Sequence, residues 1–302
     1  MVKPVIKWIG GKTQILDKLF IEFPKSINNY HEIFLGGGSV LLELLSKIKQ
    51  KAIKVEGKIY ANDLNEALIY VYKNIQTSPI ELYDAIQILI KQFNECETTL
   101  GVVNRNAQTL EEAKSSYESY YYWSRMKYNK LTSKTSIECS ALFIFLNKTC
   151  FRGMFREGPN GFNVPYGNYK SPEIINKEHI MEIHELIKNV EFKCCDFQIS
   201  LSSDNIVAGD FIYLDPPYAP ITDKSFVKYT KDGFGIERHK KLFGICQSLQ
   251  QKNIKFLMSN ADVELIKKYF PVDKYDVKTL TAKRSINSKN PGSTATEVLI
   301  KS

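Results

Sequence analysis

The chain of 302 residues has no long apolar run and no paired-cysteine motif. No stretch approaches the ~20 consecutive apolar residues of a transmembrane helix. The segment before Trp8 also lacks the apolar core of a signal peptide, so we expect neither membrane insertion nor secretion. The six cysteines contain no C-x-x-C pair, and Cys194 and Cys195 are adjacent, which is a poor disulfide geometry. They are typical of buried free thiols in a reducing compartment, so we expect a cytoplasmic protein without a zinc site.

Internal repeats and low-complexity tails are also missing. Hydrophobic residues make up 43% and charged residues 25% of the chain, which is typical of a globular protein with room for one large or two modest domains. The net charge of +8 is compatible with a polyanionic partner. Such a charge favours nucleic acid only weakly by itself.

Apolar runs and breaking residues alternate at both ends of the chain in a β-α-β pattern. Near the N-terminus, a strand is expected over Tyr30–Leu35, glycines 36–38 break it, and Ser39 is a candidate N-cap for the following helix. A short strand over Lys58–Ala61 and a helix around Ala67–Ile75 come next. The last third predicts strands at 191–195, 211–214, 255–258, 275–280 and 296–301, with helices near 237–251 and 263–270. This pattern predicts a mostly parallel sheet covered on both faces.

The middle of the chain differs from both ends. Residues 79–148 predict long helices, including the aromatic and polar run Ser115–Lys130. Phe151–Tyr169 is rich in glycine, proline, asparagine and arginine, which is typical of a hairpin or ordered loop. We therefore expect residues 76–190 to be an inserted domain that interrupts a sheet domain of residues 1–75 and 191–302.

The run Asp215-Pro216-Pro217-Tyr218 directly follows the buried strand Phe211–Leu214. The prolines stiffen the exit loop at the carboxyl end of a strand, where open α/β sheets bind ligands. Asp215 and the Pro216 carbonyl offer two acceptors to a planar amino group such as that of adenine, and Tyr218 offers a ring to stack on the base. The alternative is a rigid surface turn, but this run after such a strand favours a functional loop.

Two features of the first strands suit a nucleotide-like ligand. Glycines 36–38 allow a ligand to approach the backbone at a helix N-terminus, although a tight turn would look the same. Asp63 ends the next strand, where acidic residues bind ribose hydroxyls, although it is equally suited to cap the next helix. A dinucleotide G-x-G-x-x-G motif does not fit, because Val40 and Leu41 stand where its last glycine belongs.

The run Lys7–Thr13 contains Gly-Lys-Thr but is not a phosphate-binding P-loop. That motif requires a glycine five residues before Gly11, and Ile6 stands there. Without further context, the run predicts a buried Trp8 and a solvated Lys12.

Basic side chains alternate with apolar ones in Phe151–Arg156. Arginines such as Arg152 and Arg156 can bind guanine edges, and Met154 can insert between base steps. A solvated cationic loop is the alternative. The segment Thr281–Lys289, which contains Arg284, is a second basic stretch suited to phosphate contacts.

Together these motifs resemble the Dam-type, alpha-group DNA adenine-N6 methyltransferases. The matching segments span residues 3 to about 300 in the family's order. They are Lys7–Lys12, Phe34–Ser39, Asn62-Asp63, Asn147–Arg156, Gly161–Gly167, Asp215–Tyr218, Ser259-Asn260 and Arg284–Ile286. The family usually has proline where Ile33 stands. The resemblance implies a Rossmann-like methyltransferase sheet with an inserted, mostly helical target-recognition domain that contains a hairpin loop.

The resemblance also implies roles for individual residues. Catalysis would rest on Asp215, Pro216 and Tyr218. S-adenosylmethionine would be bound by Trp8, Lys12, Phe34, Gly36, Gly38, Asp63, Asp196 and Asp215, and no metal is expected. Double-stranded DNA would be bound by Arg152, Met154, Arg156 and Arg284. Met154 falls where the family inserts an apolar wedge, and Arg156 where it reads a guanine.

The resemblance implies methylation of adenine N6 at a short palindrome such as GATC. Arg152 replaces an asparagine common in GATC-specific members, so CATG or another four-base site stays open. Another amino group, such as cytosine N4, is a rival substrate, although members acting there more often have Ser or Asn in place of Asp215. A DNA-binding protein without activity is a second rival. We expect a monomer, with a dimer on DNA as the alternative, located with the nucleoid through its DNA.

Overall fold

The computed structural model describes residues 2–96, 102–169, 171–202, 206–220, 233–283 and 294–302. The chain forms two compact units. One comprises Gly10–Leu64 and Asn189–Ser302 and is called the sheet unit. The other comprises Val2–Ile9 and Asn65–Lys188 and is called the helical unit.

The sheet unit is built on seven strands in the order β10-β11-β9-β8-β2-β4-β7. Their bounds are β2 Tyr30–Glu32, β4 Ile59–Asp63, β7 Val190–Cys194, β8 Phe211–Leu214, β9 Lys255–Ala261, β10 Asp276–Lys283 and β11 Thr294–Lys301. The strands from β9 to β7 are parallel, and Tyr30 lies opposite both Ile59 and Phe211. Only β11 runs antiparallel, between β9 and β10. The prediction of an α/β protein with a mostly parallel sheet is confirmed.

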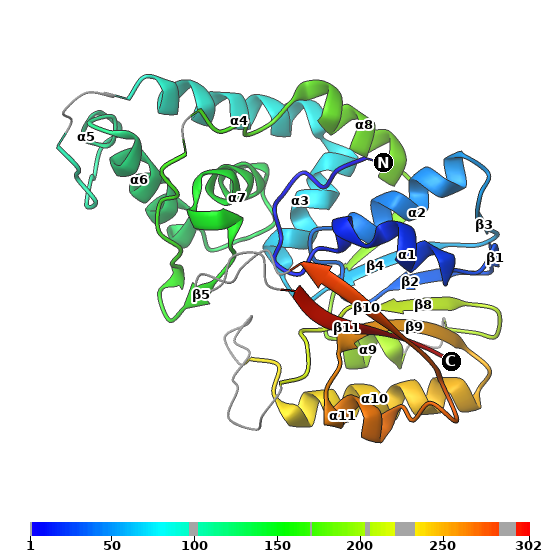
Figure 1. Cartoon of the computed structure of the whole chain (residues 1–302). Coiled ribbons are helices and arrows are strands. Elements are labelled where there is room, and N and C mark those ends of the chain that lie inside the picture. Colours follow the sequence, from blue (N-terminus) through cyan, green and yellow to red (C-terminus); the bar gives the residue numbers. More distant parts are fainter. Residues whose placement is uncertain (1, 97–101, 170, 203–205, 221–232, 284–293) are drawn as a thin grey trace. The chain divides into compact units, whose positions relative to one another are not determined.

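Helices cover both faces of this sheet (Figure 1). One face carries α1 and α2, and the other carries α9, α10 and α11. The bounds are η1 Lys12–Gln14, α1 Leu16–Ile21, α2 Ser39–Lys49, α9 Phe197–Leu201, α10 Ile236–Gln251 and α11 Glu264–Tyr269, with a small parallel pair β1 Ser26–Ile27 and β3 Lys54–Val55 beside them. Two chain segments that are far apart in sequence thus share one layered core.

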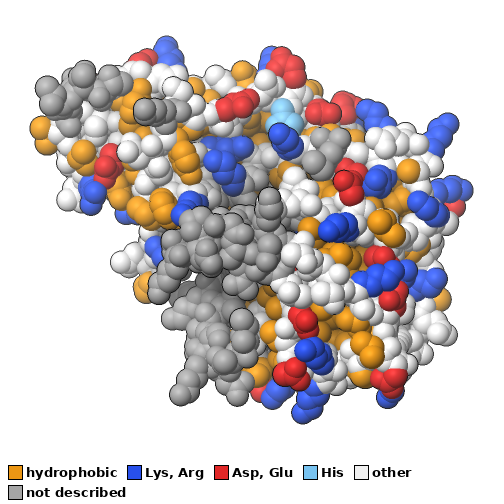
Figure 2. Space-filling model, viewed as in Figure 1, with side chains coloured by type: hydrophobic (Ala, Val, Ile, Leu, Met, Phe, Trp, Pro, Cys, Tyr) orange, Lys and Arg blue, Asp and Glu red, His pale blue; other side chains and the backbone are white. Residues whose placement is uncertain are grey.

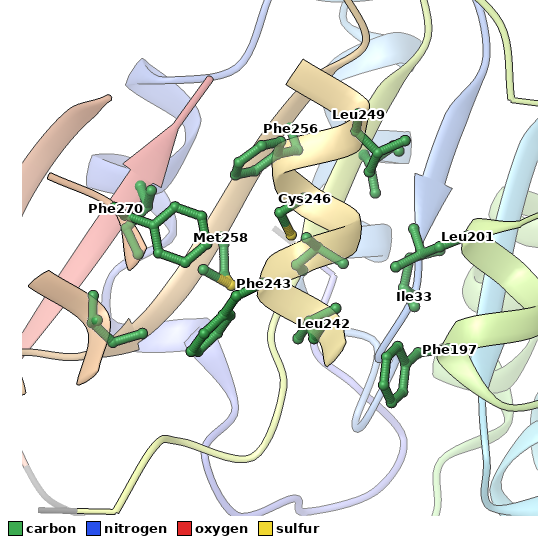
Figure 3. Packing of buried hydrophobic residues seen from close by; sticks show 14 of the residues in the cluster. Ile33, Phe197, Leu201, Leu242, Phe243, Cys246, Leu249, Phe256, Met258 and Phe270 are labelled. Carbon is green, nitrogen blue, oxygen red and sulfur yellow. The ribbon is translucent and has the colours of Figure 1, made fainter. Parts of the chain in front are cut away.

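The core on the α10 face is built from large apolar side chains (Figure 3). Phe243 and Cys246 of α10 pack in the cluster with Phe256 and Met258 of β9, and all four side chains are fully buried. Full burial of such a side chain stabilises the fold by about 1.5–3 kcal/mol. This core holds β8 and β9 rigidly, and both strands lead to the edge described below.

The starts of two helices differ from the sequence prediction. Gly38, not Ser39, is the N-cap of α2, and its φ of 75° is a left-handed conformation that glycine adopts without strain. Ser39 instead accepts a hydrogen bond from the backbone N–H of Lys12 at 3.2 Å. The following helix, α3 Glu66–Thr77, is capped by Asn65, which accepts from the N–H of Leu68. The capping role considered for Asp63 is therefore wrong.

The helical unit contains the long helices expected in the middle of the chain. Within 79–148 these are α4 Pro79–Asn94, α6 Tyr117–Lys130 and α7 Ile137–Thr149. The unit also contains α3, the four-residue α5 Leu110–Ala113 and α8 Lys177–Ile187, and the loop after α7 contains η2 Phe151–Gly153, β5 Glu157–Gly158 and β6 Gly161–Phe162. Most side chains of α7 are buried, and α3, α4 and α6 pack against it. The apolar composition of α7 on all sides explains its central place.

The two units do not coincide with the expected domain limits. Residues 2–9 and α3 cluster with the helical unit, whereas the sequence places them with the sheet. Compactness alone assigns no function to either unit, so the expected catalytic and recognition domains stay predictions.

Charges on the visible face of the sheet unit are mixed in sign. In Figure 2, Lys and Arg side chains are interspersed there with Asp and Glu side chains. Pairs such as Lys58–Glu191 at 2.6 Å are surface salt bridges, which contribute about 0–1 kcal/mol each. Within the described ranges, no helix has both the length and the apolarity that crossing a membrane requires.

Candidate active site at the carboxyl edge of the sheet

Four neighbouring parallel strands end at one edge of the sheet unit. Asp215 follows β8, Gly36 follows β2, Asp63 ends β4, and Asp196 follows β7. The chain runs from β2 to β4 and β7 in one direction and returns to β8 on the other side of β2. This reversal between β2 and β8 is a topological switch point, the usual ligand-binding crevice of open α/β sheets.

Asp215 and Lys12 form the central ion pair of this edge. Lys12 Nζ lies 2.8 Å from Asp215 Oδ2, and the Lys12 and Asp215 side chains are 4% and 19% exposed. Lys12 Nζ also donates to the carbonyl of Gly10 at 2.7 Å. The expectation of a solvated Lys12 is therefore wrong. Burial raises the pKa of the Asp215 carboxyl despite the opposing effect of Lys12.

The exit loop of β8 is held through Tyr218 and Ala219. The Tyr218 hydroxyl donates to Glu297 Oε2 at 2.8 Å, and Lys12 Nζ lies 5.0 Å from the centre of the Tyr218 ring. The N–H of Ala219 donates to Asn260 Oδ1 at 2.9 Å. Pro216, at the start of the loop, is buried. The loop therefore presents a carboxylate and an aromatic ring from a fixed backbone.

The glycine turn after β2 and the end of β4 are directly bonded. The N–H of Gly36 donates to Asp63 Oδ2 at 2.9 Å, and the N–H of Leu35 donates to the carbonyl of Asn62 at 2.8 Å. Gly36 and Gly38 have φ values of 50° and 75°, which explains why glycine stands at both positions. The sequence signal that paired this turn with Asp63 thus corresponds to a real contact.

Asp196 lies at the far side of the same edge, after β7. It caps α9 by accepting from the N–H of Gln198 at 2.9 Å, and it forms an ion pair with Arg238 of α10. Burial raises its pKa, but the bonds from Gln198 and Arg238 outweigh burial and hold the pKa below the usual range. Asp196 is thus an ionised carboxylate that the protein itself already binds at both oxygens.

An aromatic group lies beside Asp196. The Arg238 guanidinium lies over Phe197 at 5.1 Å and over Phe234 at 5.3 Å. Phe34, which precedes the glycine turn, packs with the same two rings at 5.9 Å each. This part of the edge combines flat apolar surfaces with one charged pair.

Two glutamates of the site were missed by sequence reasoning. Glu32 on β2 is 1% exposed and accepts from the Tyr30 hydroxyl at 2.7 Å. Burial raises the pKa of Glu32 to about 8, and the charges of Asp215 and Asp63 contribute to the rise. The available signal was a glutamate within the expected strand Tyr30–Leu35, shortly before the glycine turn. Glu297 had no such signal, because only the fold brings β11 beside the β8 loop.

The loop after α7 belongs to the helical unit and is well anchored there. Asn147 exchanges two hydrogen bonds of 2.8 Å with the backbone of Lys7 and donates to the carbonyl of Gly153. Asn129 of α6 likewise exchanges bonds of 2.9 and 3.0 Å with the backbone of Phe162. The strands β5 and β6 form an antiparallel pair. Trp8 stacks on Phe155 of this loop, with 5.7 Å between ring centres.

The three candidate DNA-binding side chains of this loop have different settings. Arg152 is exposed, and its backbone has a left-handed φ of 57°, which is unusual for a residue other than glycine. Met154 is half-buried. Arg156 is exposed, and its Nε donates to Asn163 Oδ1 at 2.6 Å. The fourth candidate, Arg284, lies outside the described residues.

Among the residues that the structure describes, no group of three or more His, Cys, Asp or Glu side chains has the geometry to hold a metal ion. The six cysteines are all free thiols, and four of them are buried as expected. Cys194 is exposed and Cys195 is half-buried, so the expectation of burial is wrong for this pair.

The chain as a whole is similar to known methyltransferases. Residues 8–286 match the family described as D12 class N6 adenine-specific DNA methyltransferase. The chain is 35% identical over 297 residues to the type II methyltransferase M.MjaIII of Methanocaldococcus jannaschii, covering 95% of this chain and 94% of that protein. It is 28% identical over 291 residues to the type II methyltransferase M1.LlaDCHI of Lactococcus lactis subsp. cremoris, covering 96% and 91%.

A further relative is the DNA adenine methylase of Escherichia coli strain K12. It is 28% identical over 285 residues, which cover 94% of this chain and 88% of that protein. The family match and these relatives span nearly the whole chain, both units included. The chain therefore belongs to the D12 class of N6 adenine-specific DNA methyltransferases.

Proposed function

We propose that this enzyme transfers a methyl group from S-adenosylmethionine to adenine N6 at a short palindrome in double-stranded DNA. The observation that carries the proposal is the Asp215–Tyr218 loop, fixed at the switch point directly beside the glycine turn of β2. An acceptor group and a stacking ring at that place suit a flipped-out adenine, and extrusion of the base costs a few kcal/mol.

The cofactor is assigned to the strands on the β2 side of the crevice. Asp63 would bind the ribose hydroxyls, and Gly36 and Gly38 would allow close approach at the N-terminus of α2. The flat rings beside Asp196, including Phe34, would pack against the adenine ring. Lys12, Trp8 and Asp215 complete the proposed set.

Asp196 would contribute to cofactor binding through its placement. Its oxygens already accept bonds from Gln198 and Arg238, so its orientation is fixed before any ligand arrives. A preoriented carboxylate binds with a smaller entropic cost than a mobile one.

Catalysis would depend on positioning and electrostatics. The sulfonium of S-adenosylmethionine supplies an activated methyl group, so no covalent enzyme intermediate is required. The Asp215 carboxylate and the Pro216 carbonyl would accept from the amino hydrogens of adenine and stabilise the positive charge that develops on N6. Lys12 holds Asp215 Oδ2 and thereby orients the carboxylate. The methyl carbon–sulfur bond would break as the nitrogen–carbon bond forms, S-adenosylhomocysteine would leave, and the extra proton on N6 would then pass to solvent.

DNA recognition is assigned to the loop after α7 and to Arg284. Arg152 and Arg156 are exposed and carry planar guanidinium groups that suit guanine edges, and Met154 would enter the base stack. We propose GATC as the target, with CATG as the alternative because of Arg152. We further propose a cytoplasmic enzyme that acts on DNA as a monomer, alone or within a restriction-modification system.

Sequencing with base-modification detection tests this function. DNA from cells that express the wild-type chain should contain N6-methyladenine at one short motif, and DNA from cells that express Asp215→Ala should not. N4-methylcytosine in place of N6-methyladenine would contradict the proposed substrate. The motif itself decides between GATC and CATG.

A further inference from the structure

The exit loop of β8 is held by two residues from strands on its outer side. Asn260, near the end of β9, accepts from the N–H of Ala219 at 2.9 Å, and the same oxygen accepts from the N–H of Ala261 at 2.9 Å. Glu297 of β11 accepts from the Tyr218 hydroxyl at 2.8 Å. One contact thus fixes the loop backbone, and the other fixes the ring.

The antiparallel direction of β11 explains why Glu297 reaches this loop. Parallel strands such as β9 end at the ligand edge, whereas β11 begins there, and Glu297 lies opposite Ala261 at the end of β9. The next residues, Val298 to Ile300, are buried in the core, which fixes the register of the strand. Glu297 is therefore set on a rigid strand, not on a loop.

The Tyr218 ring needs such a support. Its hydroxyl is bonded to Glu297, and its face lies 5.0 Å from Lys12 Nζ, the same ammonium that binds Asp215. The hydrogen bond to a carboxylate is of the charge-assisted kind, which is shorter and stronger than a neutral one. Without it, the ring can turn about its side-chain bonds while the backbone at Ala219 stays in place.

We propose that Glu297 is a positioning residue of the methyl-transfer site, which holds the Tyr218 ring at the angle where the target adenine stacks. The proposal rests on the function proposed above. Glu297 acts through the Tyr218 hydroxyl and touches neither substrate. A displacement of about 1 Å between reacting groups can lower the rate by ~10²-fold. Glu297, which lies outside the Asp215–Tyr218 loop, can therefore have a measurable effect on the rate.

The test is a set of single-turnover rates at saturating S-adenosylmethionine and saturating target DNA. Glu297→Ala and Tyr218→Phe should each lower the rate by about 10–100-fold, because both remove the same hydrogen bond. Glu297→Gln keeps an acceptor and should stay within about fivefold of wild type. The double variant Glu297→Ala/Tyr218→Phe should be no slower than the slower single variant. Affinity for S-adenosylmethionine should not change.

Control variants separate the possible failures. Glu264→Gln changes a glutamate that is 91% exposed on α11 and should leave the rate unchanged. A wild-type rate for Glu297→Ala, or additive losses in the double variant, would overturn the positioning role. If Glu297→Ala does not fold, a Glu297→Gln rate reduced by more than 10-fold overturns it equally. A wild-type rate for Asp215→Ala would instead reject the proposed function itself.

Discussion

The strand β8 has an aspartate at each end, and the two differ in their bonding partners and in the direction of their pKa shifts. Asp210, before the strand, accepts five hydrogen bonds of 2.9–3.1 Å, donated by Asn28, Asn29, His31 and Val207. Asp215, after the strand, is bound by Lys12. Both are carboxylates that flank the same four apolar residues, so the difference comes entirely from what the fold places around them.

The pKa values of the two carboxyls move in opposite directions. Burial raises the pKa of Asp210, but the bonds from Val207, His31 and Asn29 outweigh it and leave the pKa below its usual range. Burial of Asp215 prevails over Lys12, and its pKa is raised. A carboxylate whose oxygens are fully hydrogen-bonded within the protein stabilises the fold. A carboxylate with a raised pKa is incompletely stabilised by the protein and can gain from a bond to a ligand.

The largest expected effect is on catalysis at Asp215. Asp215→Ala should lower the single-turnover methylation rate by at least ~10²–10³-fold, because an aimed electrostatic group is lost. Its unfolding free energy should stay near that of wild type, because removing a carboxyl with a raised pKa offsets the loss of the partner of Lys12. Rates come from quenched reactions with labelled cofactor, and stability comes from denaturant unfolding. If Asp215→Ala instead lost much unfolding free energy but kept its rate per folded molecule, Asp215 would be the structural aspartate and the comparison with Asp210 would be wrong.

The opposite outcome is expected at Asp210. Asp210→Ala should lower the unfolding free energy by about 3–5 kcal/mol, because buried donors lose their acceptor. The rate per folded molecule should change little. Asp276→Ala is a matched control, since this side chain is 52% exposed, and it should change stability by less than about 0.5 kcal/mol.

The stability at Asp210 should also depend on pH in a defined direction. Its folded-state pKa lies below the unfolded value of about 3.9, so its contribution is complete above that pH and is lost as the pH falls through the folded-state pKa. Acid unfolding curves should therefore converge for wild type and Asp210→Ala at low pH. Curves that stay equally separated at every pH would show that packing, not charge, explains the difference.

Smaller effects are expected at two other charged residues of the same edge. Lys12→Ala and Asp63→Ala should each weaken S-adenosylmethionine binding by about 10–100-fold, the usual effect of losing a charge-assisted bond. DNA affinity should change less. Calorimetry with the cofactor and a separate DNA shift assay give the two values. A defect confined to DNA binding would show that these residues belong to the DNA site and that their assignment to the cofactor site is wrong.

The smallest effect is expected outside the sheet unit, at Arg156. A bidentate arginine–guanine contact supplies ~1–3 kcal/mol of discrimination. Arg156→Ala should therefore relax preference at one guanine and keep methyl transfer on the remaining sites. Methylation of a randomised oligonucleotide pool measures this directly. If wild type and variant had the same base preference at every position of the motif, Arg156 would be assigned to a phosphate contact instead.

Much of the sheet could be predicted from local patterns. The apolar run Phe211–Leu214 predicts β8 with correct bounds, and the glycines after β2 predict a turn at a helix start. Helix caps were less predictable, because Ser39 and Gly38 are both acceptable N-caps and the bond from Lys12 to Ser39 decides between them. The helices α1, α8 and α9 were not predicted. Two of them, α1 and α9, have six and five residues, which is too short for a clear periodicity. The third, α8, has 11 residues and an apolar face, so its sequence pattern was sufficient to predict it.

The sequence by itself determined the family, the parallel sheet and the position of the candidate catalytic loop, because these depend on local runs and on motif order. The tertiary structure decided which partner each carboxylate binds. Lys12 became buried against Asp215, Asp196 became paired with Arg238, and Glu297 came to bind Tyr218. These contacts join residues that lie between 42 and 203 positions apart in the sequence. Charge, burial and partner number arise only when distant segments meet, so no local pattern could specify them.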